Sequence, residues 1–525
     1  MSSRSLKVIL GGTLIDGTGG PPIRDGAVVI SGSRIVEVGP AGEVEVPRGA
    51  EVIDAAGRTV MPGFIDAHTH FMGLGVRTLT TLDLSGTRSI SEVLSLVRER
   101  LAGMPRGTWL LGRGWDESKW VERRYITKRD LDPVSPENPV ALVRVCGHLI
   151  TLNTRALQAA KITRETPDPP GGKIDRDPVT GEPTGVLRDA GMLVYKVIPP
   201  TPKEMSLKGL RKACEIALSL GCTSIHEAGM DANGFRTYQT ALEEGLLTVR
   251  AYVMPRGTMI EALEALGVRT GFGNEHLKIG SVKFILDGSM GAHTAALFEP
   301  YADDPSTSGI FVTPPERLRE MVMKAHSLGM QVAIHAIGDR GIEEALNALE
   351  AALEEEPRED HRHRIEHCEV LTEDQIARIK RLGVIASMQP NFVGEWSQPG
   401  GMYEERLGPI RLRRNNPYRR LLDEGIKVSF GSDCMPFHPL YGLWSAVNHP
   451  IEESRITLEE AVRCYTLDAA YASFEEDLKG SLEPGKLADI IILSEDLTSI
   501  PPEKIRDVKV DMTMVGGKVL YRRVA

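Results

Sequence analysis

The two ends of the chain share one pattern of hydrophobic and polar residues. Between residues 6 and 60, apolar and polar side chains alternate with a period of two in short runs separated by Gly and Pro. Such alternation predicts half-buried β-strands. Residues 476–525 repeat the pattern, as in "GKLADIIILS". We therefore predict a small β-sandwich domain formed from both chain ends, residues 1–60 and 476–525, with the middle of the chain inserted between them.

The middle of the chain, residues 61–475, alternates short apolar runs with amphipathic helical segments. This order is typical of parallel βα units, so the fold class is α/β. Eight such runs favour a (β/α)8 TIM barrel, although the pattern alone is also compatible with an open sheet. The expected strands lie at 60–70, 140–146, 223–227, 279–286, 331–335, 364–367, 384–388 and 428–432.

Two connections in this middle region are too long for simple crossovers. We expect inserted segments at about 71–139 and 154–205, and long excursions from a compact domain are usually lids or subdomains. Residues 171–189 predict a β-hairpin with Gly and Pro at its turns.

Helix starts are indicated by three capping boxes, in which Thr is followed three residues later by Glu or Gln. They are Thr313 with Glu316, Thr372 with Gln375, and Thr457 with Glu460.

Composition narrows the classes of partner. The 525 residues are 41% hydrophobic and 26% charged, which is ordinary for a globular protein. The net charge of −10 disfavours nucleic acid. No window is apolar enough for a signal peptide or a membrane span, so we expect a cytoplasmic protein without a membrane partner. The six cysteines contain no CxxC pair, which predicts free thiols.

Candidate metal ligands stand where the predicted strands end. His68 and His70 are two residues apart in "DAHTH", so on a strand both point to one face. His335, His367 and Asp433 each follow a later apolar run. One histidine at a strand end is more often structural than ligating. Four histidines and an aspartate at the ends of four strands predict a metal site at the catalytic rim of the barrel.

Lys283, in "GSVKFILDGS", is placed where it could bridge two metal ions. A cation does not bind a metal, but a buried lysine with a lowered pKa reacts with carbon dioxide to give a carbamate with two oxygen ligands. The alternative is an ion-paired lysine at the barrel mouth, with Asp287 as its partner.

These motifs resemble the amidohydrolase superfamily over nearly the whole chain. The resemblance rests on "PGFIDAHTH", the late "GSD" and "GSLEPGKLADIIIL". Finer features are similar to amidohydrolase family 3, which includes N-substituted formamide deformylases. They are "GRGWDESKW", "CGHLITLN", "VKFILDGSMGAHTAAL" and "HAIGDRG".

The resemblance implies a ligand set. His68, His70 and Asp433 would hold one metal, His335 and His367 a second, and a carboxylated Lys283 would bridge them. Some relatives keep one metal, so one or two divalent ions per chain are expected, with zinc as the default for a histidine-rich site. Deaminase branches place a Glu three residues after the fifth-strand histidine. The Gly338 found there argues against a base deaminase.

Catalytic and substrate-binding roles follow as expectations. Asp433 would move a proton from the attacking water to the leaving nitrogen, and His148 would donate to the oxyanion unless it is only structural. Trp115, Asp116 and His293 are candidates for substrate contact; packing and turn stabilisation are the alternatives. Two acidic residues, Asp339 and Glu366, are expected to orient His335 and His367.

The leading functional hypothesis is hydrolysis of an amide-type C–N bond in a small molecule, such as an N-formyl or N-acyl amide with an apolar substituent. A cyclic amide or lactone is the second hypothesis. A metal-dependent lyase or isomerase on the same scaffold is a third, and a non-catalytic binding protein is a fourth. Assembly into a homo-oligomer stays open, since no segment marks an interface.

Overall fold

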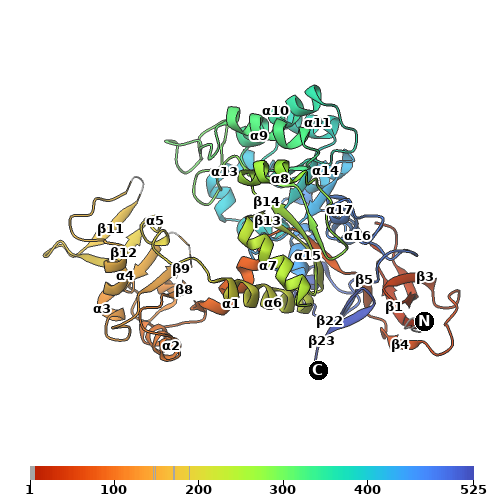
Figure 1. The fold of residues 1–525 in the computed structure, drawn as a ribbon, viewed down its shortest axis with the longest axis horizontal. Helices are drawn as coiled ribbons and strands as arrows, with labels where there is room; N and C mark the ends of the chain where they lie inside the picture. The colour runs from red at the N-terminus through yellow and green to blue at the C-terminus, as the bar shows by residue number, and fades with distance from the viewer. Residues whose placement is uncertain (1–5, 146, 148, 170–171, 189, 525) are drawn as a thin grey trace. The chain divides into compact units, whose positions relative to one another are not determined.

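The computed structural model describes residues 6–145, 147, 149–169, 172–188 and 190–524. It divides into two compact units. One comprises residues 1–72 and 213–525, and the other comprises residues 73–212. The chain therefore leaves the first unit once and returns to it (Figure 1).

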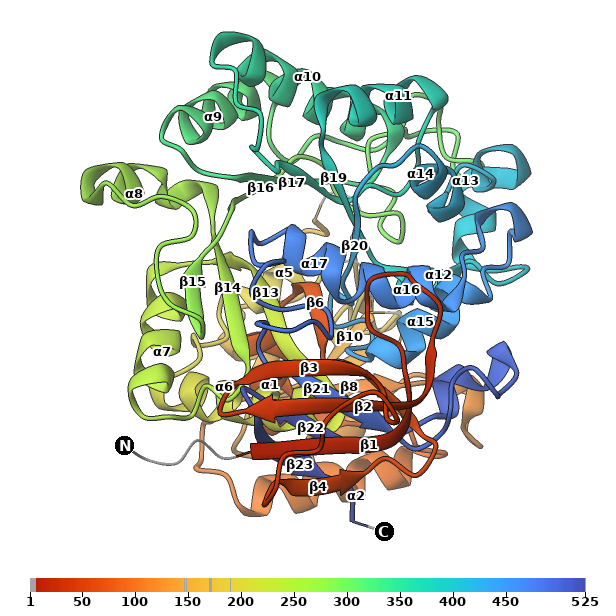
Figure 2. The ribbon, with the colours of Figure 1, turned by 90° about the vertical axis from the view of Figure 1, so that its right-hand side faces the viewer.

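In the first unit, strands from both chain ends form one eight-stranded sheet. Its order is β23-β22-β21-β5-β1-β2-β3, with β4 paired to β1. Strand β5 joins the ends, because it pairs with β1 on one side and with β21 on the other. Figure 2 shows strands of the two chain ends, β1 to β4 and β21 to β23, side by side. The strands are β1 (Leu6–Leu14), β2 (Ile23–Ser31), β3 (Arg34–Pro40), β4 (Glu51–Asp54), β5 (Thr59–Pro62), β21 (Ile490–Leu493), β22 (Val510–Val515) and β23 (Lys518–Arg522).

The same unit holds two sheets of parallel strands. One has the order β15-β14-β13-β6 and the other the order β16-β17-β18-β19-β20. Their strands are nearly all buried, as expected where both faces of a parallel sheet are covered. They are β6 (Phe64–Thr69), β13 (Cys222–Met230), β14 (Arg250–Pro255), β15 (Leu277–Ile279), β16 (Val282–Ile285), β17 (Val332–Ala336), β18 (Arg364–His367), β19 (Ile385–Met388) and β20 (Val428–Phe430).

The two parallel sheets adjoin at both edges. Next to β20, the backbone N–H of Asp433 donates to His68 O at 2.8 Å. A Cβ on Gly431 would lie 2.3 Å from His68 N, so only glycine permits this close approach. At the other edge, Arg256 and Lys283 form an isolated parallel bridge. The contact between Asp433 and His68 brings the ends of β6 and β20 next to each other.

Helices follow most of the parallel strands. Two predicted capping boxes are confirmed, Thr372 with Gln375 and Thr457 with Glu460. The third is not formed, because Thr313 instead donates to Ile285 O at 2.7 Å. The helices are α7 (Ala232–Glu243), α8 (Ile260–Leu266), α9 (Pro315–Ser327), α10 (Asp339–Glu355), α11 (Glu373–Leu382), α12 (Pro390–Trp396), α13 (Met402–Leu412), α14 (Tyr418–Asp423), α15 (Pro439–Val447), α16 (Leu458–Cys464) and α17 (Leu467–Tyr471). Within the described residues, no helix has the length and apolarity needed to span a bilayer.

Two further helices, α1 (Phe71–Thr80) and α6 (Lys203–Ser219), contain the points at which the chain passes between the units.

The second unit is built on a six-stranded sheet of order β11-β12-β10-β9-β8-β7. The predicted hairpin is confirmed as the antiparallel pair β11 and β12. Its elements are β7 (Thr81–Asp83), α2 (Ile90–Ala102), β8 (Leu110–Trp115), α3 (Lys128–Leu131), β9 (Val140–Arg144), β10 (Leu149–Leu152), α4 (Thr154–Ala159), β11 (Lys173–Arg176), β12 (Pro183–Arg188) and α5 (Met192–Tyr195).

One strand assignment is corrected. The apolar run at 140–146 was expected in the barrel, but β9 pairs with β8 and β10 in the sheet of the second unit. The parallel strand that takes its place is β14, which pairs with β13 and β15. The two expected insertions are therefore parts of one continuous unit that also includes β9.

Candidate metal centre

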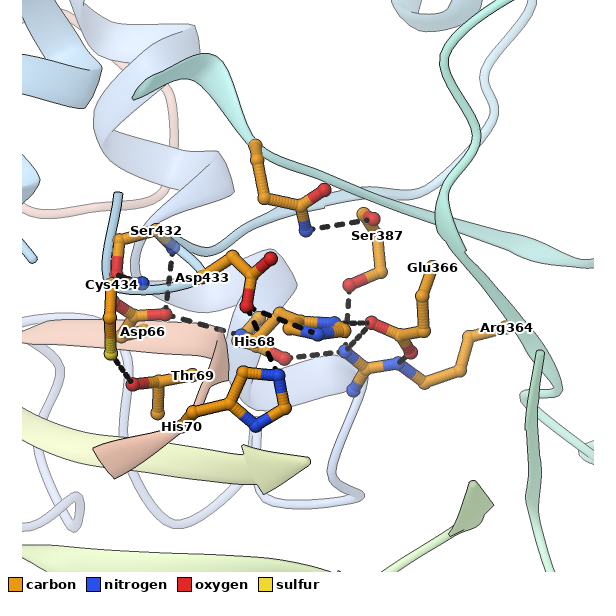
Figure 3. Close-up of polar contacts among 12 residues, drawn as sticks. Asp66, His68, Thr69, His70, Arg364, Glu366, Ser387, Ser432, Asp433 and Cys434 are labelled. Atoms are coloured by element: carbon orange, nitrogen blue, oxygen red, sulfur yellow. Dashed lines mark hydrogen bonds and ion pairs between the residues drawn. The ribbon is translucent and has the colours of Figure 1, made fainter. Parts of the chain in front are cut away.

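Three of the predicted ligands gather at the ends of β6 and β20. The ligand atoms of His68, His70 and Asp433 all lie within 4.8 Å of one another. Asp433 Oδ1 is 3.3 Å from His70 Nε2 and 3.9 Å from His68 Nε2. Figure 3 shows the three side chains turned toward one another. Two imidazoles and a carboxylate are ligands that divalent transition metals and zinc accept.

His68 is held by a buried ion pair on its other side. Its Nδ1 contacts Glu366 Oε2, and both side chains are almost completely buried. Glu366 is held in turn by Arg364, whose Nε donates to Oε1 at 2.5 Å. With Nδ1–H donating to the carboxylate, His68 presents the Nε2 lone pair toward Asp433. A carboxylate behind a histidine is the usual support of a metal-binding imidazole.

Asp433 is positioned by the turn that follows β20. Asp66 accepts from the Ser432 N–H at 2.9 Å and from the Ser432 hydroxyl at 2.5 Å. The same carboxylate accepts from the backbone N–H of His68 at 3.2 Å. Asp66 therefore ties the end of β6 to the turn that carries Asp433. Burial raises the pKa of Asp66 to about 7, against the opposing effect of these hydrogen bonds.

His335 and His367 lie beside this group. Their ring centroids are 4.4 Å apart, and His367 is 4.8 Å from His68. The Nε2–H of His335 donates to Gly288 O at 2.9 Å, which leaves Nδ1 as its lone pair. Within the described residues, His367 Nδ1 is buried without a hydrogen-bond partner.

The backbone at two of these positions is strained. His367 has a φ of 72° and Asp433 a φ of 51°, in the left-handed region that residues other than glycine rarely adopt. Such conformations cost about 1–3 kcal/mol and gather at functional sites.

Burial keeps the histidines neutral, which is the form that binds metal. It lowers the pKa of His68 and of His335 to about 3, and the neighbouring Lys283 ammonium acts in the same direction. Burial also lowers the pKa of His367 well below its ordinary value.

Lys283 is buried at the same site. Its Nζ has no hydrogen-bond partner among the described residues, and burial lowers its pKa to about 8. The charges of Glu366 and Asp433 act on it in the opposite direction. The alternative of an ion pair with Asp287 is not formed. Asp287 instead accepts the backbone N–H groups of Ala296 and Gly338, at 2.9 and 3.0 Å.

The predicted substrate-binding residues are divided between the two units, with Trp115 and Asp116 in the second and His293 in the first. Trp115 is fully buried in the second unit, where it stacks on Trp120 and donates to Leu142 O at 3.1 Å. Its expected contact with substrate stays a prediction. Asp116 accepts from Ser118 at the start of a short 3-10 helix.

The remaining two predicted residues have different outcomes. His293 contacts Asp303 through Nε2 at 3.2 Å, so its place in substrate binding stays a prediction. His148 lies outside the described residues.

The expected orienting roles are also corrected. Glu366 supports His68 rather than His367. Asp339 does not reach His335, and it accepts from the Phe298 backbone N–H at 2.9 Å. Two groups from the loop after β16 face His335 Nε2 instead: the carbonyl of Gly288 at 2.9 Å and Asp287 Oδ1 at 3.5 Å.

Sequence reasoning missed Arg364 and Asp66. Each stands two residues before a group already singled out, Glu366 and His68, and so shares its strand face. Extending the two-residue alternation backwards along β18 and β6 would have found both.

Comparison with known proteins identifies the family of the chain. The model of the amidohydrolase family matches residues 51–521. The protein YtcJ of Bacillus subtilis (strain 168) is 34% identical over 90% of this chain and 91% of its own length. The N-substituted formamide deformylase of Arthrobacter pascens is 28% identical over 95% of both chains.

Among solved structures, the chain is similar to an uncharacterized metal-dependent hydrolase from Pyrococcus furiosus. The TM-score is 0.77 at 30% identity, and the match covers 95% of this chain and 100% of that chain. The chain thus belongs to the amidohydrolase family of metal-dependent hydrolases, which act on carbon–nitrogen bonds.

Proposed function

We propose that this protein hydrolyses an amide-type C–N bond of a small molecule, an N-formyl or N-acyl amide with an apolar substituent. The observation that carries the proposal is the gathering of His68, His70 and Asp433, with Lys283, His335 and His367 beside them. Support for the substrate class comes from the Arthrobacter relative, which is a formamide deformylase by name.

We also propose that the two parallel sheets are parts of one (β/α)8 barrel. The contacts at both edges, Asp433 with His68 and Arg256 with Lys283, support this reading. The ligands would then stand at the carboxyl ends of the strands, where barrel enzymes carry their active sites. The eight-stranded sheet formed by the chain ends would be the accompanying β-sandwich.

The residues present fit a divalent metal site. His68, His70 and Asp433 would hold one ion, and His335 and His367 a second; zinc suits this donor set. Lys283 fits a carbamate, because it is a buried amine without a hydrogen-bond partner and with a lowered pKa. Divalent ions bound there would polarise the amide carbonyl and make water acidic enough to attack at neutral pH.

The chain's own residues would then position the substrate and move the proton. Asp433 lies beside both His68 and His70, so its carboxylate would accept a proton from the attacking water and pass it to the leaving nitrogen. Glu366 would keep His68 in the tautomer that leaves Nε2 unprotonated. His148 would donate a hydrogen bond to the developing oxyanion.

An aromatic cluster beside the histidines supports an apolar substituent. The ring of Phe392 stacks parallel to His367 at 5.9 Å, and Trp396 packs on Phe392 at 4.7 Å. Both aromatic residues belong to α12, which begins directly after β19. A substrate amide near His367 would have its substituent next to this apolar surface.

The experiment is turnover of a panel of N-formyl, N-acetyl and N-aryl amides, with cyclic amides and lactones beside them, in water enriched in oxygen-18. We expect amide cleavage with one labelled oxygen entering the carboxylate product. Asp433→Asn should abolish cleavage, whereas His276→Ala, at an exposed histidine, should not. Cleavage of cyclic amides or lactones alone, or a product without the label, would contradict the proposal.

A further inference from the structure

Arg256 lies at the edge of the candidate metal centre, directly after β14. It precedes a short 3-10 helix, Gly257–Met259. Its backbone N–H donates to Met230 O at 2.9 Å, and it forms the isolated parallel bridge with Lys283. Residues paired across neighbouring strands carry their side chains on the same face of a sheet. Arg256 therefore shares a face with the buried lysine of the site.

Two further observations support this orientation of the Arg256 side chain. Tyr252 and Met254 pack together in a buried cluster, and alternation along β14 continues from them to Arg256. On the opposite face, a Cβ on Gly257 would lie 2.6 Å from the Phe284 ring. Residues 257 and 284 thus face one way, and residues 256 and 283 face the other.

The guanidinium of Arg256 is held at one end. Its Nε donates to Gly229 O at 2.5 Å, which fixes the side chain against the end of β13. The residue is exposed, and within the described part of the chain it makes no ion pair. This contrasts with Arg364, which is buried against Glu366. The two Nη groups of Arg256 are therefore available to an anion that enters the site.

We propose that Arg256 binds a carboxylate of the substrate, so that the preferred substrates are N-acylated amino acids and related amides bearing a carboxylate. This inference rests on the proposed amide hydrolysis. A guanidinium presents parallel N–H groups that match a planar carboxylate, and this match gives direction as well as affinity. The anchored Nε would orient the amide group toward the ligands.

The test compares N-formylphenylalanine with N-formylphenethylamine, which lacks only the carboxylate. We expect the wild-type kcat/KM to be at least about tenfold higher for the carboxylate, the range of one charge-assisted hydrogen bond. Arg256→Ala should bring the kcat/KM values of the two amides to within about twofold of each other, and Arg256→Lys should keep part of the preference. Arg236→Ala, at an exposed arginine on α7, is the matched control. Equal turnover of both amides by the wild type, or an unchanged preference in Arg256→Ala, would overturn the inference.

A binding experiment separates this inference from the proposed function. If neither these formamides nor any amide of the panel is hydrolysed, the proposed function fails, and calorimetric binding of the two formamides then tests Arg256 alone. The inference survives if the wild type binds N-formylphenylalanine at least about tenfold more tightly than Arg256→Ala does. It is overturned if both proteins bind the two compounds equally.

Discussion

His68 and Glu366 are in contact through Nδ1 and Oε2, although 298 residues separate them in the sequence. The contact joins β6 to β18 and leaves the other nitrogen of His68 facing Asp433. A charged carboxylate behind a ligand both fixes the ring and increases its basicity. Arg364 pairs with the same carboxylate, so the buried Glu366 stays ionised. The pKa of Glu366 is held well below its ordinary value.

Glu366→Gln tests this support. We expect metal affinity to fall by about 10–100-fold, as for other partners of metal-binding histidines. Arg364 would lose its buried counter-charge, so the free energy of unfolding should fall by about 3–5 kcal/mol. Metal titration and urea unfolding measure the two effects. Glu354→Gln, at an exposed position of α10, should change neither; wild-type metal affinity in Glu366→Gln would count against the role of Glu366.

His70→Ala separates ligand loss from unfolding. The His70 side chain is 51% exposed, so its removal should change the stability of the metal-free protein by no more than about 0.5 kcal/mol. Metal content and amide turnover should both fall strongly. Elemental analysis beside thermal unfolding of metal-free samples provides the measurement. A folded His70→Ala that keeps its full metal content would remove this residue from the ligand set.

Substitution of Lys283 should have opposite effects on metal binding and on the stability of the metal-free protein. Lys283→Ala should lose metal and activity, and added propionate should restore part of both by supplying the missing carboxylate. In the metal-free protein, Lys283→Met should raise the free energy of unfolding by about 1–3 kcal/mol, because it removes a buried amine without a partner. Retention of two metals by Lys283→Ala would show that the lysine is not a bridge.

The pH dependence of stability tests the burial of the neutral histidines. The pKa of His335 is about 3 in the folded chain, below the unfolded value of about 6.5. The unfolded chain therefore binds more protons between these values, so stability is lost as the pH falls from about 6.5 to 3. In metal-free protein, His335→Gln should reduce this slope by up to about 1.4 kcal/mol per pH unit.

Asp66 acts in the opposite sense. Its pKa is raised to about 7, so its contribution to stability is lost as the pH rises through that value. The slope difference between wild type and His335→Gln isolates the histidine from this effect. Urea unfolding at a series of pH values provides the slopes, and identical slopes would contradict a neutral buried His335.

The residues that gather at the candidate metal centre were easier to find from the sequence than the groups that support them. His68 and His70 share a strand face by alternation, and His335, His367 and Asp433 mark the ends of apolar runs, so these positions could be found from local pattern. The contact of Glu366 with His68 depends on which strands adjoin and in what register, and one sequence does not encode these locally.

The run at 140–146 was assigned to the wrong sheet for the same reason, because strand pairing is not encoded locally. The run at 140–146 is apolar, as a barrel strand would be, and β9 within it pairs in parallel with β8. Its sheet partners lie in the second unit, and only the fold reveals them. The stacking of Trp115 on Trp120 could not be predicted from the sequence either, since a tryptophan beside an aspartate is equally compatible with a pocket wall and with a buried stack.

The most direct test of the account is the metal content of protein purified without chelator, measured by elemental analysis together with turnover of an N-formyl amide. We expect close to two divalent ions per chain, loss of turnover when they are removed, and its return when zinc is added. Full amide turnover by protein shown to contain no metal would contradict the account, because the gathered histidines and Asp433 would then have no ion to hold.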